Sequence, residues 1–424
     1  MEKKTKLLIM GIDSATAFAL EYAESQGIYT IITDYNPPEK APLKLQADEY
    51  WMINVGDIDL LEKRCREENV AGVFAGNHEF CLDMTRELCK RLELPFYASD
   101  EGWASGRDKA RFKRHCMACG MDVAHWYHID EAFDTDILES MEYPVVVKPA
   151  DASSQRGFSI CHNEKELRAG YMNALQFSQS GNIIVEEFVD GEEIDVIYYV
   201  HEGIPYLLCI NDKLTVMVNE RMNQSLLPNQ SRYFDEYVSE LSDKINQFVE
   251  RLEYKEGAMF LQAIRKDGKY YFLEMGCRMD GFGCWVSTKT NYHFSYLECM
   301  VDLAVGRKPE INLSVLDFSP KGKYSATYLY WAAPGQVKEV IGRELIENTD
   351  GITVAMERFR PGDTVEKTDN LIQVGWFLEI VAGSSAELAD KIRMINHNLQ
   401  LLDTNGKSLM LPYENYEYIL ANYS

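Results

Sequence analysis

The sequence predicts a protein of mixed α/β and α+β class, built from three units. Short apolar runs alternate with amphipathic segments over the first 105 residues, which is typical of a parallel sheet covered by helices. Further along, two strand-like runs flank the pair Asp267-Gly268, which favours an antiparallel hairpin. After residue 308, short strands precede a late helix, which indicates a smaller α+β unit.

Composition and charge narrow the classes of partner. The 424 residues are enough for two or three domains with ordinary cores. They include 43 lysines and arginines against 67 aspartates and glutamates, and the resulting net charge of −24 repels nucleic acids and anionic membranes. The sequence shows no secretory signal pattern and no apolar run long enough to span a bilayer. We therefore expect a cytoplasmic protein that binds neither nucleic acid nor membrane.

The first unit, residues 1–105, is predicted to be a Rossmann-like lobe. "TKLLIMGI" and "YTIITDYN" are expected as parallel strands around the helix "SATAFALEYAESQG", and "AGVFAG" as a further strand between two helices. The first turn, "GIDSAT", lacks the pattern G-x-G-x-x-G, so NAD or FAD is not expected there. Asn77, His78 and Glu79 follow a strand at the edge where open sheets bind ligands, and are candidates for contact with a substrate.

The second unit, residues 106–308, is expected to have two lobes, at about 106–185 and 186–308. It contains the strand pattern "YPVVVKPA", a helix with apolar residues on one face in "YVSELSDKINQFVERL", and the hairpin around Asp267-Gly268. Residues 219–231, "NERMNQSLLPNQS", are polar without a clear periodicity and are expected to form a mobile loop near the substrate. The third unit, residues 309–424, is the smaller α+β domain.

Lys148 is the first candidate for binding an anion. It follows three valines and ends a predicted buried strand, where a lone ammonium group is costly unless it faces a negative charge. The loop that follows contains Ser153, Ser154 and Gly157, which are small enough for backbone N–H groups to close over phosphate oxygens. From these residues alone, a lysine at the surface and an ordinary turn explain the pattern equally well.

Gln262 and Glu274 form a candidate metal site. They lie six residues on either side of Gly268, so the predicted hairpin brings them to opposed positions on adjacent strands. Opposed side chains are close enough to share a metal ion, and both supply the oxygen ligands that Mg²⁺ prefers. A polar pair at the edge of a sheet explains the same spacing equally well.

The ten cysteines have no regular spacing and are expected to be reduced. Cys116 and Cys119 form a C-x-x-C near three histidines, but a second such pair is missing and their helical spacing favours packing over zinc binding. Cys277 and Cys284 flank Arg278 without a histidine beside them in sequence, and are likewise interpreted as packing residues.

Four motifs occur in the order and approximate spacing of the ATP-grasp superfamily. They are Lys109 in "GRDKARFKR", "YPVVVKPA" with its small-residue loop, "IIVEEFVDGEE" and "FLQAIRKDGKYYFLEMGCR". Residues 1–308 resemble this superfamily, counting the Rossmann-like lobe that precedes the ATP-grasp fold in such proteins. The resemblance implies that the protein binds ATP and Mg²⁺, with Mn²⁺ as an alternative metal.

The resemblance also implies roles for individual residues. Lys109 and Lys148 match lysines that contact ATP phosphates, and Arg278 matches the arginine that holds the transferred phosphoryl group or the acyl phosphate. Gln262 and Glu274 match the magnesium ligands, with Gln262 resembling the carbamoyl-phosphate synthetase variant. The remaining matches are the phosphate-covering loop with Ser153, Ser154 and Gly157, the adenine-binding segment Glu186, Glu187, Phe188 and Val189, and the ribose-binding Glu193.

One position departs from the family pattern. Members commonly carry Glu-x-Asn-x-Arg, with the asparagine as a further metal ligand, whereas Gly276 stands at the middle position here. The resemblance therefore implies a metal site that lacks one carbonyl ligand. The last unit resembles the final domain of L-amino acid ligases in its strand pattern and its late glycine-then-helix segment.

The resemblance implies an ATP-dependent carboxylate-amine ligase that forms an amide or peptide bond through an acyl phosphate and releases ADP and phosphate. The expected partners are small-molecule carboxylate and amine substrates, including amino acids, and a second copy of the chain in a homodimer. Two alternatives stay open. Gln262 favours an enzyme that phosphorylates bicarbonate, as carbamoyl-phosphate synthetases do, and Gly276 favours a module that binds ATP without chemistry.

Overall fold

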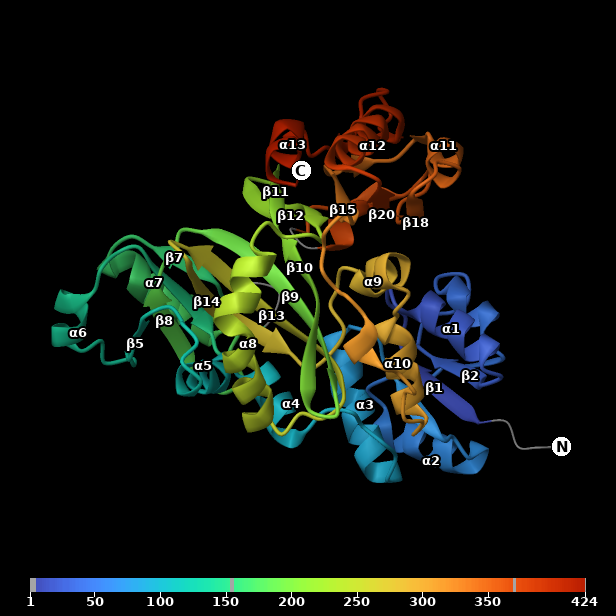
Figure 1. Ribbon diagram of the computed structural model, residues 1–424, viewed down its shortest axis with the longest axis horizontal. Helices are drawn as coiled ribbons and strands as arrows, with labels where there is room; N and C mark the ends of the chain where they lie inside the picture. Colours follow the sequence, from blue (N-terminus) through green and yellow to red (C-terminus); the bar gives the residue numbers. More distant parts are fainter. Residues whose placement is uncertain (1–4, 153–155, 369–370, 424) are drawn as a thin grey trace.

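The computed structural model describes residues 5–152, 156–368 and 371–423. Figure 1 shows four bodies: an N-terminal unit at the right, a small lobe at the left, a large lobe between them and a C-terminal unit at the top. Strands and helices are mixed throughout, so the predicted fold class is confirmed.

The N-terminal unit is a parallel sheet of four strands in the order β3-β2-β1-β4. Apolar residues alternate between two cores along β1, because helices cover both faces of the sheet. The sequence analysis predicted neither β3 nor α4. Strand β3 has three residues, which is too short to show a period of two. The elements are β1 (Lys6–Met10), β2 (Tyr29–Thr33), β3 (Glu49–Trp51), β4 (Gly72–Phe74), α1 (Thr16–Ser25), η1 (Pro42–Gln46), α2 (Ile58–Glu68), α3 (Glu79–Leu92) and α4 (Asp100–Arg107).

The small lobe is an antiparallel sheet in the order β5-β8-β6-β7. Val145 and Val147 point to one face of β6 and pack with Leu167 and Tyr171 of the covering helix α7. Lys148 follows Val147 in the strand, and because successive side chains of a strand alternate, it points to the opposite face. The elements are β5 (Trp126–Tyr127), β6 (Val145–Pro149), β7 (Ser159–Cys161), β8 (Ile183–Glu187), α6 (Thr135–Ser140) and α7 (Glu164–Leu175).

The large lobe is an antiparallel sheet in the order β10-β9-β13-β14. The predicted hairpin is confirmed: Lys266 pairs with Lys269, and Asp267 and Gly268 both have positive φ, as a two-residue hairpin turn requires. Helices α5 and α8 pack on one face, and α9 and α10 on the other. The elements are β9 (Glu192–His201), β10 (Ile204–Asp212), β13 (Gly257–Lys266), β14 (Lys269–Gly276), α5 (Lys109–Ala118), α8 (Phe234–Arg251), α9 (Cys284–Tyr292) and α10 (Tyr296–Ala304).

The C-terminal unit is built on a sheet in the order β11-β12-β15-β20-β18, with β22 also paired to β15. Two short strand pairs, β16 with β19 and β17 with β21, lie beside it. Its strands are β11 (Leu214–Val218), β12 (Arg221–Pro228), β15 (Tyr324–Ala332), β16 (Gly335–Gln336), β17 (Glu339–Ile341), β18 (Ile352–Glu357), β19 (Thr364–Val365), β20 (Val374–Ala382), β21 (Gln400–Leu402) and β22 (Met410–Leu411). Its helices are η2 (Leu313–Val315), α11 (Arg343–Glu347), η3 (Leu371–Gln373), α12 (Ser385–Asn398) and α13 (Tyr416–Asn422).

The prediction of a mobile loop over residues 219–231 is wrong. Asn219 and Glu220 both have positive φ and close a hairpin between β11 and β12. Leu226 to Pro228 then pair with β15, about a hundred residues further along the chain. The C-terminal sheet therefore takes two strands from within residues 186–308, and the expected division at residue 308 does not mark its edge.

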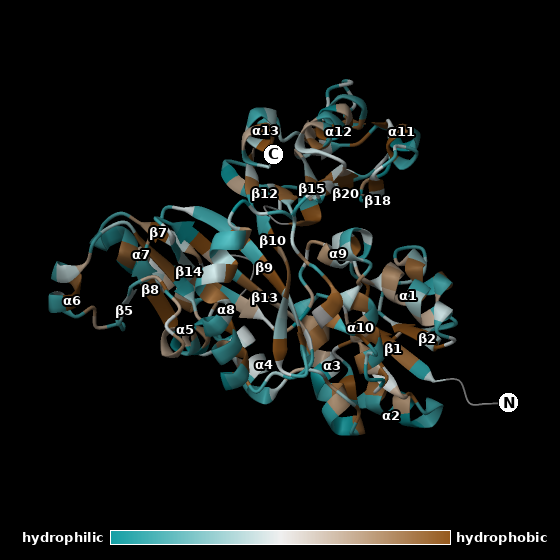
Figure 2. Ribbon diagram, in the orientation of Figure 1, coloured by the Kyte–Doolittle hydropathy of each residue, from teal (hydrophilic) through white to brown (hydrophobic). Residues whose placement is uncertain are grey.

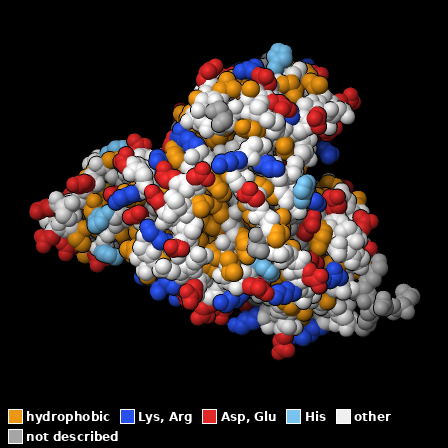
Figure 3. All heavy atoms as spheres, viewed as in Figure 1, with side chains coloured by type: hydrophobic (Ala, Val, Ile, Leu, Met, Phe, Trp, Pro, Cys, Tyr) orange, Lys and Arg blue, Asp and Glu red, His pale blue; other side chains and the backbone are white. Residues whose placement is uncertain are grey.

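The apolar residues lie mainly on the inner strands and on the helix faces that cover them (Figure 2). Acidic side chains are spread over the face shown in Figure 3, including the tip of the small lobe that carries α6. Among the described residues, no helix combines the length and the apolar character needed to cross a bilayer.

A buried carboxyl group joins the C-terminal sheet to the large lobe. Glu379 of β20 is fully buried, and the Thr327 hydroxyl lies 2.8 Å from its carboxyl group and 3.0 Å from the Phe282 carbonyl oxygen. Asn229 also donates to Glu379, at 3.2 Å. One hydroxyl hydrogen cannot serve two acceptors, whereas a protonated Glu379 donates to Thr327 while Thr327 donates to Phe282.

The stability of the fold should therefore fall as the pH rises. Burial raises the pKa of Glu379 from 4.5 to about 8, so between these values the folded chain keeps a proton that the unfolded chain releases. This stabilising contribution is fully present below pH 4.5 and is lost, at about 1.4 kcal/mol per pH unit, as the pH rises to 8.

A Glu379→Gln variant removes this titration while keeping the shape of the side chain. In urea unfolding at pH 5 and pH 8, the free energy of unfolding of the wild type should fall relative to that of the variant by several kcal/mol. An unchanged difference between the two proteins at both pH values would show that Glu379 is ionised in the fold.

Candidate functional site

Gln262 and Glu274 occupy directly opposed positions of the hairpin, so the predicted pairing is confirmed. The register explains how this happens. Near the turn, Ala263 pairs with Phe272, and an unshifted ladder would set Gln262 opposite Leu273. A β-bulge at this point moves the register by one residue and brings Glu274 to the face that carries Gln262.

Glu274 forms an ion pair with Lys109, at the start of helix α5. The Lys109 ammonium lies 3.0 Å from Oε2 of Glu274 and donates to the Ala152 carbonyl oxygen at 2.8 Å. Burial alone would raise the pKa of Glu274, but Lys109 and then Lys148 and Lys213 hold it below its usual value. The carboxylate is therefore ionised at neutral pH, and Lys109 connects it to the start of the loop after β6.

Lys148 belongs to a second ion cluster, in the small lobe. Its ammonium lies 2.5 Å from Oε1 of Glu186, and the ammonium of Lys113 lies 2.7 Å from Oε2. Glu186 and Lys113 are buried, whereas Lys148 is 12% exposed. Burial would raise the pKa of Glu186, but the two ammonium groups lower it. Glu186 thus orients Lys148, and its place in the adenine-binding segment stays a prediction.

The predicted phosphate-covering loop is only partly described. Ser153 and Ser154 lie outside the described residues. Gly157 has a φ of +74°, and a Cβ atom there would lie 2.9 Å from the Pro149 ring and 3.1 Å from the Cα of Ala174. Both the backbone conformation and the close packing explain why glycine ends this loop.

The segment between the lobes runs from β8 into β9. Glu187 accepts a hydrogen bond from the His125 backbone N–H at 3.1 Å, Phe188 is 36% exposed and Val189 is buried. Glu193 begins β9 with an exposed side chain whose Oε2 lies 3.5 Å from the Lys213 ammonium. The binding of adenine and ribose by this segment stays a prediction.

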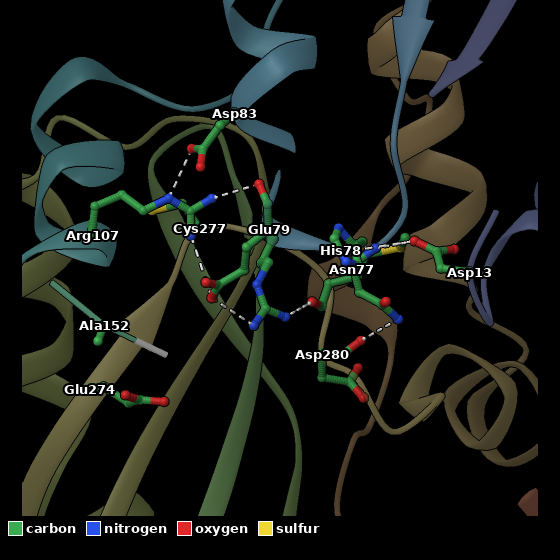
Figure 4. A network of polar contacts seen from close by, with 12 residues as sticks. Asp13, Asn77, His78, Glu79, Asp83, Arg107, Ala152, Glu274, Cys277 and Asp280 are labelled. Atoms are coloured by element: carbon green, nitrogen blue, oxygen red, sulfur yellow. Dashed lines mark hydrogen bonds and ion pairs between the residues drawn. The ribbon is translucent and has the colours of Figure 1, made fainter. Parts of the chain in front are cut away.

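Arg278 comes close to the N-terminal unit through Glu79, the first residue of α3. It donates to Oε1 of Glu79 at 3.3 Å and to the Met279 carbonyl oxygen at 2.8 Å. Arg107 reaches the same carboxylate at 3.4 Å and also donates to Asp83 at 3.0 Å (Figure 4). Two guanidinium groups thus share Glu79, and Nε of Arg278 has no hydrogen-bond partner within the described parts of the chain.

Packing explains why glycine occupies position 276. Phe260 pairs with Gly276 across the hairpin, and a Cβ atom at 276 would lie 2.3 Å from the Phe260 ring. The same ring lies 4.6 Å below the Arg278 guanidinium, a distance at which a cation and an aromatic face attract each other. Phe260 supports the arginine and fills the space that an asparagine side chain would need.

Of the three candidates at the end of β4, only Glu79 joins the cluster around Arg278. The Asn77 amide donates to the Ser14 hydroxyl at 2.9 Å and to the Asp280 carbonyl oxygen at 3.3 Å. The Asn77 and His78 backbone N–H groups both donate to the Asp13 carboxylate (Figure 4). Asn77 therefore links the N-terminal unit to the large lobe through Asp280, His78 binds Asp13 within the N-terminal unit, and Glu79 extends towards the polar cluster.

Comparison with known proteins shows which folds this arrangement resembles. The model of the D-ala D-ala ligase C-terminus family matches residues 119–211. The crystal structure of an L-amino acid ligase from Bacillus licheniformis covers 96% of this chain and all of its own, with 17% identity and a TM-score of 0.76. The biotin carboxylase domain of a 2-oxoglutarate carboxylase from Hydrogenobacter thermophilus, solved with MgADP, ADP and bicarbonate, covers 95% of this chain and 91% of its own, with 18% identity and a TM-score of 0.78. The chain therefore shares the fold of these two proteins, as its ATP-grasp motifs predicted.

Sequence similarity to curated proteins covers a smaller part of the chain than the structural similarity does. A D-alanine–D-alanine ligase of Desulfotalea psychrophila is 36% identical over 107 residues, which are 24% of this chain and 33% of that protein. The chain thus spans a third of the length of this relative. The structural similarity, in contrast, extends over nearly the whole chain.

Two residues of the candidate site were missed by the sequence analysis. Lys213 follows β10, and its ammonium lies 3.1 Å from Oδ1 of Asp195 on β9. Burial raises the pKa of Asp195 to about 6, while burial of Lys213 is offset by Asp195 and Glu193, which raise the lysine pKa. The alternation of charged and apolar residues in "EEIDV" was the available signal, since it puts Glu193 and Asp195 on one face of a strand.

The cysteines beside the candidate site are buried. Burial raises the pKa of the Cys277 thiol to about 12 and that of Cys284 well above its usual value, so neither is a thiolate at neutral pH. Cys116 and Cys119 are also buried with free thiols. Within the described ranges, no three His, Cys, Asp or Glu side chains gather closely enough to hold a metal by themselves, so the candidate metal site depends on the amide of Gln262.

Proposed function

We propose that the protein is an ATP-dependent carboxylate-amine ligase. The observation that supports this most is the convergence of three lysines on a single hairpin acid, with an arginine close behind it in the chain. Lys109 contacts Glu274, Lys148 and Lys213 contribute to its low pKa, and Arg278 follows four residues later on the same chain segment. In a chain of net charge −24, such a collection of cations suits a polyphosphate ligand.

The proposed reaction proceeds in two steps. A carboxylate oxygen of the substrate attacks the γ-phosphorus of ATP, the bond to the bridging oxygen breaks, and ADP leaves. The amine nitrogen then attacks the carbonyl carbon of the acyl phosphate, loses a proton, and displaces inorganic phosphate. Lys109 and Lys148 offset charge on the ATP phosphates, and Arg278 holds the transferred group from the other side.

The residues of the hairpin fit magnesium. Glu274 is an ionised carboxylate, and the opposed Gln262 supplies a neutral amide oxygen. Bound there, Mg²⁺ or Mn²⁺ would neutralise charge on the phosphate oxygens. Lys109 now forms the ion pair with Glu274, so this lysine must turn from the carboxylate to the phosphates when nucleotide and metal bind.

The proposed substrates are small carboxylates and amines, including amino acids. Glu79 is held by Arg107 and Arg278 next to the site and is the carboxylate best placed to orient an ammonium group. Arg278 is the cation best placed to meet the acid partner, since its Nε is buried without a hydrogen-bond partner among the described residues.

Two further parts of the proposal concern the state of the protein. All ten cysteines are free and buried, which suits the reducing environment of the cytoplasm. We also expect a homodimer, because two-fold dimers are the commonest oligomers, and sedimentation at several protein concentrations would test this.

The proposed activity is tested by measuring ADP and phosphate release with ATP and Mg²⁺ in the presence of pooled amino acids, pooled carboxylates or bicarbonate. We expect stimulation by one acid pool together with an amine, its loss in Glu274→Ala, and its retention in Glu240→Ala, which removes an exposed acid from α8. Stimulation by bicarbonate alone would favour carboxyphosphate chemistry. ATP that is bound but not consumed in any pool would contradict the ligase and favour an ATP-binding module.

A further inference from the structure

One row of polar residues crosses three strands of the large lobe. Asp195 on β9 is directly opposite Gln262 on β13, and Gln262 is directly opposite Glu274 on β14. Directly opposed residues of antiparallel strands share a face of the sheet. Ile197, two residues after Asp195, packs in the same core cluster as Phe260, two residues before Gln262, which confirms that Asp195 and Gln262 face the same side.

Asp195 is buried but only partly neutralised. Its side chain is 1% exposed, and Oδ1 lies 3.1 Å from the Lys213 ammonium. Oδ2 has no hydrogen-bond partner in the described parts of the chain. Lys213 is moreover shared with Glu193, at 3.5 Å. A buried carboxylate with a free oxygen is costly unless a cation or a donor completes its surroundings.

The other end of the row lacks a ligand. The superfamily resemblance places a carbonyl ligand at position 276, where Phe260 leaves no room for a side chain. Glu274 and Gln262 alone give Mg²⁺ two protein oxygens, and water or phosphate oxygens would complete its six ligands. The strand on the other side of Gln262 is where a further protein oxygen is available in this row, because Asp195 on β9 is paired with Gln262.

We propose that Asp195 is a protein ligand of the divalent metal site, together with Gln262 and Glu274, in place of the ligand that Gly276 cannot supply. This inference rests on the proposed function. With adjacent strands about 4.8 Å apart, the row is roughly 10 Å wide, which is enough for two ions about 4 Å apart with Gln262 between them. When the metal binds, Asp195 gives up its ion pair with Lys213 and contacts the metal instead. The Lys213 ammonium then turns to the phosphates.

The test is a Mn²⁺ titration followed by the electron paramagnetic resonance signal of free Mn²⁺, with and without a non-hydrolysable ATP analogue. Asp195→Asn should weaken Mn²⁺ binding at least tenfold. Lys213→Met removes the competing ammonium group and should strengthen Mn²⁺ binding in the absence of nucleotide. Glu192→Gln, which changes a neighbouring acid of β9 that is bound to Arg232, should bind Mn²⁺ as the wild type does.

Unchanged Mn²⁺ affinity in Asp195→Asn would overturn the inference. Unchanged or weaker Mn²⁺ affinity in Lys213→Met would also overturn it. The Lys213→Met measurement decides the question even if Asp195→Asn does not fold. Affinity for the nucleotide analogue is measured separately on the wild type. Failure to bind the analogue would contradict the proposed function, while the titration without nucleotide would still decide whether Asp195 binds the metal.

Discussion

An Arg278→Lys variant is expected to lose at least 100-fold in kcat/KM for the ligase reaction. The guanidinium group is fixed by Glu79, by the Met279 carbonyl oxygen and by the Phe260 ring, and its Nε is left for another acceptor. Lysine keeps the charge but loses the planar fork and the stacking, so charge that develops on the transferred group meets a poorly placed cation. The measurement is steady-state ADP release over a range of acid concentrations.

Arg107→Lys is the matched control for this prediction. Arg107 shares Glu79 with Arg278, but its other partners, Asp83 and the Trp103 ring, belong to the N-terminal unit. We expect this change to cost less than tenfold in kcat/KM, because it disturbs Glu79 without removing the group that meets the phosphate. Equal losses in the two variants would show that Arg278 acts only by holding Glu79 in place.

The second large effect is expected at Glu186. Changing this residue to glutamine leaves the ammonium groups of Lys113 and Lys148 without their carboxylate, and Lys113 is fully buried. Removing one partner of a buried ion pair typically costs 3–5 kcal/mol in stability. We therefore expect Glu186→Gln to reduce the free energy of unfolding in urea by about this amount and to weaken ATP binding, since Lys148 loses its orientation.

Two variants sharpen this test. Glu164→Gln breaks an exposed ion pair with Arg168 in the same lobe and should cost less than about 1 kcal/mol. The double change Lys113→Met with Glu186→Gln removes the unpaired buried charge and should recover part of the lost stability. A Glu186→Gln protein as stable as Glu164→Gln would mean that the buried cluster contributes little.

Local patterns in the sequence were enough to predict many of the strands and helices and the pairing of two candidate site residues. Three valines before Lys148 marked a strand that ends in a cation, and Asp267-Gly268 marked a hairpin whose turn has the expected positive φ angles. The opposition of Gln262 and Glu274 was also predicted, although the counting was centred on Gly268. The turn is centred between Asp267 and Gly268, and the β-bulge shifts the register by one residue, which brings Gln262 opposite Glu274.

The features that were missed depend on contacts between distant parts of the chain. β12 looked like a loop because its partner β15 lies about a hundred residues away, and nothing in the local pattern indicates that pairing. The contact between Glu79 and Arg278 joins residues 199 positions apart, and the Lys213–Asp195 pair depends on how β10 ends beside β9. The ion pairs of Glu186 with Lys113 and Lys148 were missed because the sequence cannot show that these lysines approach its side chain.

The most direct test of the account follows oxygen from the acid substrate. Once the acid pool that stimulates ADP release has been resolved to one compound, its carboxylate is labelled with ¹⁸O and the released phosphate is analysed by mass spectrometry. An acyl phosphate predicts that each phosphate formed carries one labelled oxygen, because the carboxylate oxygen that attacked phosphorus leaves with it. Unlabelled phosphate released together with the amide product would contradict the proposed mechanism.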